Sequence, residues 1–245
     1  MKTYVVKIGG VASDQLNKQF FSTIHKWQAQ GIQIVIIHGG GHYITELMEQ
    51  FQVKRQIKNG LRVTDENTLE LTKMALLGQV QPKLISLFQK EGLQPISLHA
   101  GCDQLIQGKI INHAELGYVG QVTAINHDML KLQMKHHKIP VIAPLGITKE
   151  GQWLNINADE VACKVASCIQ ADELFLLTDV PGIKENNQWL KRIDLSKIEK
   201  LKEQNIITGG MIPKLDSAKY ALLHGVKSVN INNNNIHRFG TKITA

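Results

Sequence analysis

The chain has 245 residues, of which 43% are hydrophobic and 20% charged, so it can bury a sizeable core without disulfide or metal staples. Its three cysteines form no C-x-x-C pair, and no apolar run approaches the roughly 20 residues of a membrane span, which argues against secreted and membrane classes and favours a cytoplasmic protein. The net charge of +7 allows a nucleic-acid partner, but the lysines are scattered and no aromatic-rich basic motif accompanies them, so we expect none.

Apolar periodicity predicts strands and helices that alternate from the amino terminus onward. Ser13 or Asp14 is expected to cap the first helix, which precedes the second strand. The expected strands lie at residues 4–8, 32–37, 94–98, 140–145, 174–177 and 229–231. The expected helices after the first lie at residues 44–51, 65–90, 127–138, 159–169, 196–204 and 211–224.

This alternation is typical of an α/β protein, a three-layer αβα sandwich with a mainly parallel central sheet. Pro82 is expected to bend the long helix at 65–90, and residues 104–124 are expected to form a hairpin inserted at the edge. No linker divides the chain, so we expect one domain over 1–245, with an N-lobe at about 1–146 and a C-lobe at about 147–245.

The stretch IIHGGGHY at residues 36–43 places three glycines directly after a predicted strand. A hydrolase of the HGGG type also needs G-x-S-x-G, and the common nucleotide loops need G-x-G-x-x-G or G-x-x-x-x-G-K-[ST]; the chain has none of these strings. Consecutive amides where a strand meets a helix face outward and carry partial positive charge. The run therefore predicts an anion site.

A second glycine pair, Gly9-Gly10, ends the first strand at the same carboxyl edge of the predicted sheet. Parallel α/β folds bind their ligands at that edge, so both glycine turns are expected to face one crevice. Lys7 is the one charged residue in this otherwise apolar strand, and it is a candidate for contact with the anion. An edge lysine that points to solvent is the alternative.

Seven separated strings extend this pattern over nearly the whole chain. They are KIGG (7–10), HGGG (38–41), NGLRVTD (59–65), AELGYVGQV (114–122), LNINADE (154–160), LLTDVPGI (176–183) and GGMIPK (209–214). With them the chain resembles the amino-acid kinase family, and GLRVTD together with NINAD resembles the branch that phosphorylates N-acetyl-L-glutamate in arginine biosynthesis. The resemblance implies an ATP-dependent transfer of a phosphoryl group to a carboxylate.

The resemblance implies a catalytic role for Lys7, Lys214 and Asp159. Phosphoryl transfer between two anions needs positioning and positive charge. By resemblance, Lys7 neutralises the phosphoryl group during transfer and Lys214 assists from the leaving-group side of the nucleotide. Asp159 holds both lysines by charge-assisted hydrogen bonds and is not a general base, because a carboxylate acceptor has no proton to lose. Asp159 is also a candidate N-cap for a helix that begins at Glu160.

The resemblance implies an acceptor site built from Arg62, Asn155, Asn157 and the amides of Gly40 and Gly41. The planar guanidinium of Arg62 fits one carboxylate of the substrate, and the two alternating asparagines can donate to its polar groups from one side. The glycine amides then hold the reacting carboxylate beside the γ-phosphate of ATP. This assignment explains why the glycine run has no side chains.

The resemblance implies a nucleotide site with Gly9, Gly10, Asp179 and Lys214, and Mg²⁺ that comes with ATP and is held mainly by its phosphates. Asp179 stands just before Pro-Gly, where a turn-forming aspartate is the alternative. We find no His, Cys or Asp spacing typical of zinc and expect no metal site formed by the protein itself.

Other members of the family respond to arginine through an additional helix before the first strand. Here the strand begins at residue 4, so we expect no inhibition of that kind and a homodimer in place of a hexamer. Two alternatives stay open: a sister kinase that acts on another small acid, and a non-catalytic amino-acid or nucleotide sensor on the same scaffold.

Overall fold

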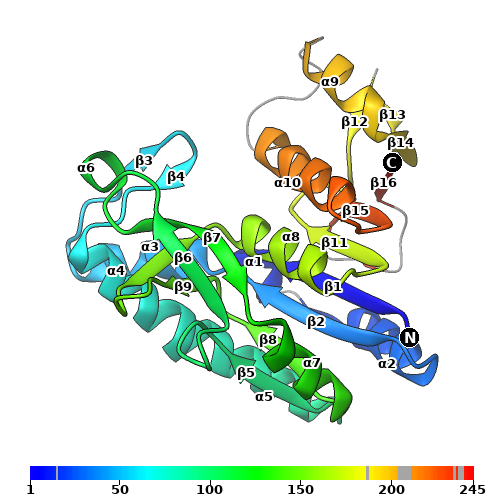
Figure 1. Ribbon diagram of the computed structural model, residues 1–245, viewed down its shortest axis with the longest axis horizontal. Coiled ribbons are helices and arrows are strands. Elements are labelled where there is room, and N and C mark those ends of the chain that lie inside the picture. Colours follow the sequence, from blue (N-terminus) through cyan, green and yellow to red (C-terminus); the bar gives the residue numbers. More distant parts are fainter. Residues whose placement is uncertain (15, 186–187, 204–210, 234–235, 237–239) are drawn as a thin grey trace.

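The computed structural model describes residues 1–14, 16–185, 188–203, 211–233, 236 and 240–245. A central sheet of eight strands has the order β14-β16-β15-β11-β1-β2-β8-β5 (Figure 1). The strands are β1 (Thr3–Ile8), β2 (Gln33–His38), β5 (Pro95–Leu98), β8 (Ile139–Ile142), β11 (Glu173–Leu177), β14 (Arg192–Asp194), β15 (Ser228–Asn232) and β16 (Thr241–Thr244). β16 is antiparallel to β15 and parallel to β14, whereas the other six strands run parallel. The predicted mainly parallel sheet is confirmed.

Helices cover both faces of the sheet, because apolar side chains alternate between the two faces along each strand. Val6 and Ile8 of β1 belong to one buried cluster with Phe20 and Leu84, whereas Val5 belongs to a second cluster on the opposite face. The first cluster includes residues of α2 (Lys18–Ala29) and α5 (Gln81–Lys90). The second includes residues of α7 (His127–Lys135), α8 (Ala158–Cys168) and α10 (Met211–Leu223). These three layers form the predicted αβα sandwich.

A second, smaller sheet stands beside the sandwich. It closes into a barrel in the order β10-β7-β6-β9, formed by β6 (Ile106–Ile110), β7 (Val119–Ile125), β9 (Leu145–Ile147) and β10 (Trp153–Ile156). β6 and β7 pair antiparallel, so the predicted hairpin at 104–124 is present, but it belongs to the barrel and not to an edge of the central sheet. Figure 1 shows the barrel on the same side as the short hairpin of β3 (Ile57–Lys58) and β4 (Leu61–Arg62).

The long helix expected at 65–90 is divided into three parts. α4 (Glu66–Lys73) continues into a wide π-helix, η1 (Met74–Val80), and then into α5. Pro82 lies in the first turn of α5, directly after the π-helix, and it has no backbone N–H to donate there. The predicted interruption thus takes the form of a π-helix ahead of the proline, and such wide turns often occur at functional sites.

The helix between β1 and β2 that was expected to begin after Ser13 or Asp14 is α2, and it starts later than predicted. A single turn, α1 (Gly10–Ser13), follows the first glycine pair, and Asn17 caps α2 by accepting a hydrogen bond from the amide of Phe20 at 3.0 Å. The prediction of Ser13 or Asp14 as the cap was wrong, because three capping residues lie within five positions and local sequence does not choose between them. The other elements are α3 (Gly41–Gln50), α6 (His113–Leu116), α9 (Leu195–Glu203), β12 (Lys184–Glu185) and β13 (Gln188–Trp189).

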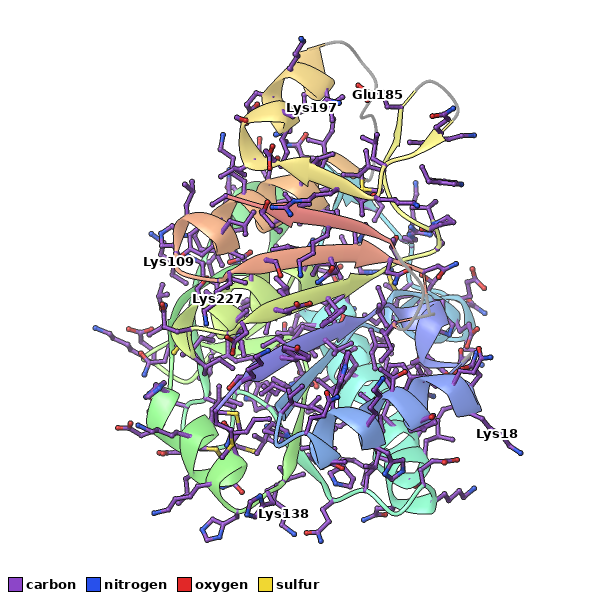
Figure 2. The ribbon with its side chains drawn as sticks, turned by 90° about the vertical axis from the view of Figure 1, so that its right-hand side faces the viewer. Lys18, Lys109, Lys138, Glu185, Lys197 and Lys227 are labelled. Carbon is purple, nitrogen blue, oxygen red and sulfur yellow. The ribbon has the colours of Figure 1, made fainter. Side chains whose placement is uncertain are left out.

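The surface charge is spread over the molecule. Figure 2 shows Lys18, Lys138, Lys197 and Lys227 at different edges of the molecule, in agreement with the scattered lysines of the sequence. In the described part of the chain, no helix has both the length and the apolar character needed to cross a membrane.

Candidate active site

Two glycine turns meet at the carboxyl edge of the central sheet. β1 and β2 are parallel neighbours with Ile8 opposite His38, so the glycines that follow each strand lie side by side. The amide of Gly39 donates to the carbonyl of Ile8 at 2.7 Å, which joins the two turns. α1 begins at Gly10 and α3 at Gly41, so amides without helical partners are concentrated between the turns, where they suit an anion.

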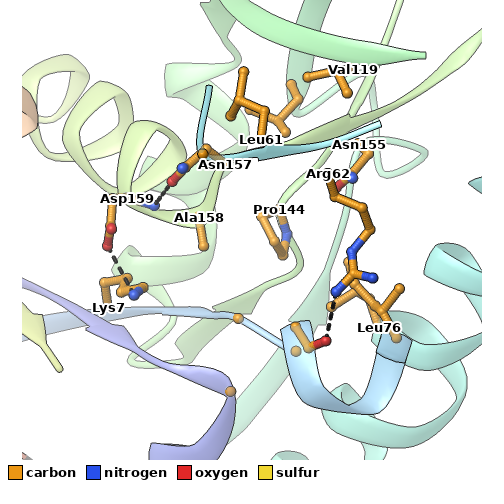
Figure 3. A pocket seen from close by; sticks show the side chains of 17 residues that line it. Lys7, Leu61, Arg62, Leu76, Val119, Pro144, Asn155, Asn157, Ala158 and Asp159 are labelled. Atoms are coloured by element: carbon orange, nitrogen blue, oxygen red, sulfur yellow. Dashed lines mark hydrogen bonds and ion pairs between the residues drawn. The ribbon is translucent and has the colours of Figure 1, made fainter. Parts of the chain in front are cut away.

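A cavity of about 290 Å³ opens above these turns (Figure 3). Its walls combine backbone of the glycine turns with side chains of the β3–β4 hairpin, the barrel and the start of α8. The lining residues are Lys7, Gly10, Gly39, Gly40, Gly41, Ile44, Gly60, Leu61, Arg62, Leu76, Val119, Pro144, Asn155, Ile156, Asn157, Ala158 and Asp159. Among the predicted site residues, Gly9, Asp179 and Lys214 are not part of this lining.

Lys7, Asp159 and Lys214 form a cluster beside the cavity, in which Lys7 and Asp159 are buried and Lys214 is partly exposed. Nζ of Lys7 lies 2.9 Å from Oδ1 of Asp159, and Nζ of Lys214 donates to Oδ2 at 2.8 Å. Lys7 is only 7% exposed and Asp159 only 8%, so Lys7 does not point to solvent. The structure therefore brings the three residues together through one carboxylate that holds two ammonium groups.

The charges of this cluster shift the pKa values of its members. Burial raises the pKa of the Asp159 carboxyl, but the charges of Lys7 and Lys214 outweigh burial and hold this pKa at about 2. Burial lowers the pKa of the Lys7 ammonium, and the Asp159 carboxylate opposes that shift only in part. The cluster thus places excess positive charge next to the glycine amides.

Arg62 faces the cavity from β4. Its guanidinium donates to the carbonyl of Gly41 and to Oγ1 of Thr45, both at 2.9 Å, and its Nη1 lies 3.0 Å from the sulfur of Met48. Within the described residues these acceptors are all neutral, so the cation has no carboxylate partner. The positive charge of the guanidinium is therefore available to bind an anionic ligand.

Asn155 and Asn157 both line the cavity, as their alternation in sequence predicts. Nδ2 of Asn155 donates to Oγ1 of Thr64 at 3.0 Å, and Oδ1 of Asn157 accepts from the amide of Asp159 at 2.8 Å. Asn157 is therefore the N-cap of α8. The alternative reading of Asp159 as that cap was wrong, because α8 already begins at Ala158.

The predicted nucleotide residues lie around the glycine turns and the end of β11. Asp179 follows β11, is exposed, and accepts a hydrogen bond from Oγ1 of Thr178 at 2.8 Å. That hydrogen bond is the main reason why the pKa of Asp179 lies below its ordinary value, and the charges of Lys214 and Lys7 lower it further. Gly209 and Gly210, predicted to open the helix that carries Lys214, lie outside the described residues.

Several apolar residues of the cavity were not predicted. Leu76, in the π-helix, approaches Gly40 so closely that a Cβ atom on Gly40 would lie 2.6 Å from its Cδ2. Leu61 and Pro144 complete the apolar part of the lining. Leu61 lies within the string NGLRVTD, but nothing in the local sequence around Leu76 distinguishes it from other apolar residues of the long helix.

Comparison with known proteins places these features in a family. A sequence profile described as the amino acid kinase family matches residues 2–233. A protein named acetylglutamate kinase from Listeria monocytogenes serotype 4b (strain F2365) is 49% identical over 241 residues, which cover 98% of this chain and 96% of that protein. A protein of the same name from Leuconostoc mesenteroides is 46% identical over 244 residues, which cover 100% of each chain.

A solved structure agrees with the sequence comparisons. The crystal structure of smu.665 from Streptococcus mutans UA159 has a TM-score of 0.93 and 40% sequence identity, and the match covers 99% of this chain and 98% of that chain. The αβα sandwich described above is thus the amino acid kinase fold. On the profile match and these full-length relatives, the chain belongs to the amino acid kinase family.

Proposed function

We propose that this protein phosphorylates the side-chain carboxylate of N-acetyl-L-glutamate with ATP, a step of arginine biosynthesis. The carrying observation is the pair of lysines, Lys7 and Lys214, held by the buried carboxylate of Asp159 beside a cavity lined by the glycine turns. The names of the relatives support N-acetyl-L-glutamate as the acceptor. The enzyme is a phosphotransferase that uses a carboxyl group as acceptor.

The acceptor lies in the cavity between Arg62 and the glycine turns. Arg62 binds the carboxylate that does not react, since its guanidinium has only neutral partners in the described residues. Asn155 and Asn157 donate their side-chain amides to the remaining polar groups of the substrate. The amides of Gly40 and Gly41 hold the reacting carboxylate beside the γ-phosphate.

ATP binds next to the first glycine turn. Gly9 and Gly10 contact its phosphates, while Asp179 contributes from the loop after β11 and Lys214 from the first turn of α10. Within the described residues, no three His, Cys, Asp or Glu side chains gather into a metal site. We propose that Mg²⁺ comes with ATP and is held mainly by the phosphates.

The reaction is a direct in-line transfer. A carboxylate oxygen of the acceptor bonds to the γ-phosphorus as the bond from that phosphorus to the bridging oxygen of ADP breaks, so the products are an acyl phosphate and ADP. Lys7 and Lys214 stabilise the negative charge that spreads over the moving group, and no base or covalent enzyme intermediate is needed. Asp159 keeps the two ammonium groups in place.

The arrangement also suggests how the protein is organised. We assign acceptor binding mainly to an N-lobe of residues 1–146 and ATP binding mainly to a C-lobe of residues 147–245, within one domain. We further propose a cytoplasmic homodimer. Phe51 and Met74 are large apolar residues that are 58% and 50% exposed, and a second copy would cover such side chains.

The test is acyl-phosphate formation from Mg-ATP, trapped as hydroxamate with hydroxylamine. The acceptors compared are N-acetyl-L-glutamate, glutamate, aspartate, N-acetyl-aminoadipate and none. Hydroxamate with N-acetyl-L-glutamate alone is the expected result. Product with a different acid would move the chain to a sister kinase, and absence of product in a protein that still binds ATP would contradict catalysis and favour a sensor.

A further inference from the structure

His38, the last residue of β2, is fully buried, yet its two ring nitrogens have unequal surroundings. Nδ1 lies 3.0 Å from the carbonyl oxygen of Gly39, whereas Nε2 has no hydrogen-bond partner within the described residues. Ile34 and Ile36 occupy the same face of the strand and belong to the apolar cluster that includes residues of α2 and α5. Because a buried polar atom without a partner costs free energy, packing alone does not explain an imidazole here.

The hydrogen bond to Gly39 shows which ring nitrogen of His38 carries the hydrogen. A carbonyl oxygen can only accept, so Nδ1 of His38 carries the hydrogen. Burial lowers the pKa of His38 to about 4, and the ring is therefore neutral near pH 7, with a bare Nε2. The donor on Nδ1 is thus present throughout the pH range in which the protein would work.

This hydrogen bond fixes the direction of the next amide. The C=O of Gly39 and the N–H of Gly40 belong to one planar trans peptide, in which they point in opposite directions. The amide of Gly39 donates to Ile8, so both polar groups of Gly39 are held. The N–H of Gly40 consequently points away from the buried ring; Gly40 lines the cavity, and within the described residues no acceptor meets this amide.

We infer that His38 is a positioning residue, whose Nδ1–H holds the carbonyl of Gly39 so that the N–H of Gly40 is presented to the anion in the cavity. The inference deepens the proposed function and rests on it for the identity of that anion, the reacting carboxylate. His38 does not touch the substrate. It fixes a donor in advance, which spares the reaction the cost of turning a peptide during the transfer.

The test uses variants that separate the donor from the volume of the ring. In His38→Asn the side-chain amide places an N–H near the position of Nδ1, whereas His38→Leu removes the donor and keeps an apolar side chain. His38→Gln keeps a polar side chain but places its N–H near the position of Nε2. The matched control is His25→Leu, which removes an imidazole hydrogen bond to a carbonyl, that of Glu91 at 2.9 Å, far from the cavity.

The expected result is a loss of about 100-fold in kcat for His38→Leu and His38→Gln, the size seen when one preorganised donor is lost. His38→Asn should recover most of the activity, and His25→Leu should keep that of the wild type. Thermal unfolding of each variant provides the control for folding. Equal kcat for the Asn and Leu variants would overturn the inference.

A second measurement separates this inference from the proposed function. The amide resonance of Gly40 is followed in ¹⁵N-glycine-labelled protein while inorganic phosphate, and then the acceptor with a non-hydrolysable ATP analogue, is added. We expect a shift of this resonance in the wild type and in His38→Asn, and none in His38→Leu. If the wild type made no hydroxamate, the proposed function would fail, while the response of Gly40 to phosphate would still decide the role of His38.

Discussion

Lys7 and Asp159 lie in contact, 2.9 Å between Nζ and Oδ1, although one comes from the first strand and the other from α8. Each is less than one-tenth exposed, so water does little to weaken the interaction. Burial lowers the pKa of Lys7, and the carboxylate opposes this shift. The carboxylate is therefore what keeps the lysine charged when no substrate is present.

For this reason, we expect Asp159→Asn to change the pH dependence of the reaction as well as its rate. Without the carboxylate the pKa of Lys7 falls further, so its positive charge is lost at a lower pH as the pH rises. The alkaline limb of the kcat profile should move to lower pH, and kcat should fall by about 100-fold or more. Hydroxamate formation measured across the pH range tests both effects.

The matched control is Asp172→Asn, whose carboxylate pairs with the exposed Lys227 at 2.6 Å, away from the cavity. That variant should keep the profile of the wild type. If the alkaline limb of the kcat profile were at the same pH in Asp159→Asn as in the wild type, the proposed role of Asp159 in keeping Lys7 charged would be contradicted.

Lys7→Ala and Lys214→Ala should each lower kcat strongly, by about 100-fold or more, with smaller effects on the KM of either substrate. The reason is that these charges matter most when negative charge spreads over the moving phosphoryl group. Steady-state kinetics separate kcat from KM. Lys219 lies on the same helix as Lys214 and forms a surface ion pair with Glu199, so Lys219→Ala serves as the control. Near-normal turnover in both Lys7→Ala and Lys214→Ala would contradict the mechanism.

Arg62→Ala should mainly raise the KM of the acyl acceptor, by about 10- to 100-fold, since a hydrogen bond to a charged group contributes about 1.5–3 kcal/mol. The KM of ATP should stay nearly unchanged, because the guanidinium lies on the acceptor side of the cavity. Initial rates at varied concentrations of each substrate test the prediction, with the exposed Arg55→Ala as control. An increase confined to the KM of ATP would mean that the two sites are assigned the wrong way round.

Gly40→Ala and Gly41→Ala should differ in stability although the two glycines are adjacent. A Cβ atom on Gly40 would lie 2.6 Å from Leu76, whereas one on Gly41 meets nothing within 4 Å. Overpacking costs about 1–3 kcal/mol, so the free energy of unfolding should fall in Gly40→Ala and change little in Gly41→Ala. Urea denaturation measures it, and Gly40→Ala should cost less in a Leu76→Ala background than in the wild type, because the truncated side chain no longer meets the added Cβ atom. Equal stability of both single variants would argue against this contact.

The sequence predicted those parts of the site that depend on strand ends. Lys7, Gly10 and Gly40 lie within or just after β1 and β2, and parallel strands bring their carboxyl ends to one edge whatever the details of packing. The alternation of Asn155 and Asn157 likewise follows from the period of an extended chain.

Other features depend on distant residues and could not be predicted. The π-helix that brings Leu76 to Gly40 keeps the apolar spacing of an ordinary helix, so periodicity does not reveal it. The burial of His38 was not predicted, because it follows from the packing of α2 and α5 over β2. The strand Thr241–Thr244 was not predicted; it pairs with β15, the strand before it, and with β14, which lies much earlier in the sequence.

The position of β16 has a consequence for the order in which the sheet can assemble. In the described part of the chain, β14 pairs with β16 alone, yet it leaves the ribosome well before Thr241–Thr244 does. Until Thr241–Thr244 emerges, the nascent protein carries an open strand edge at β15, and β14 lacks its partner strand. An open edge of this kind can pair wrongly with another chain.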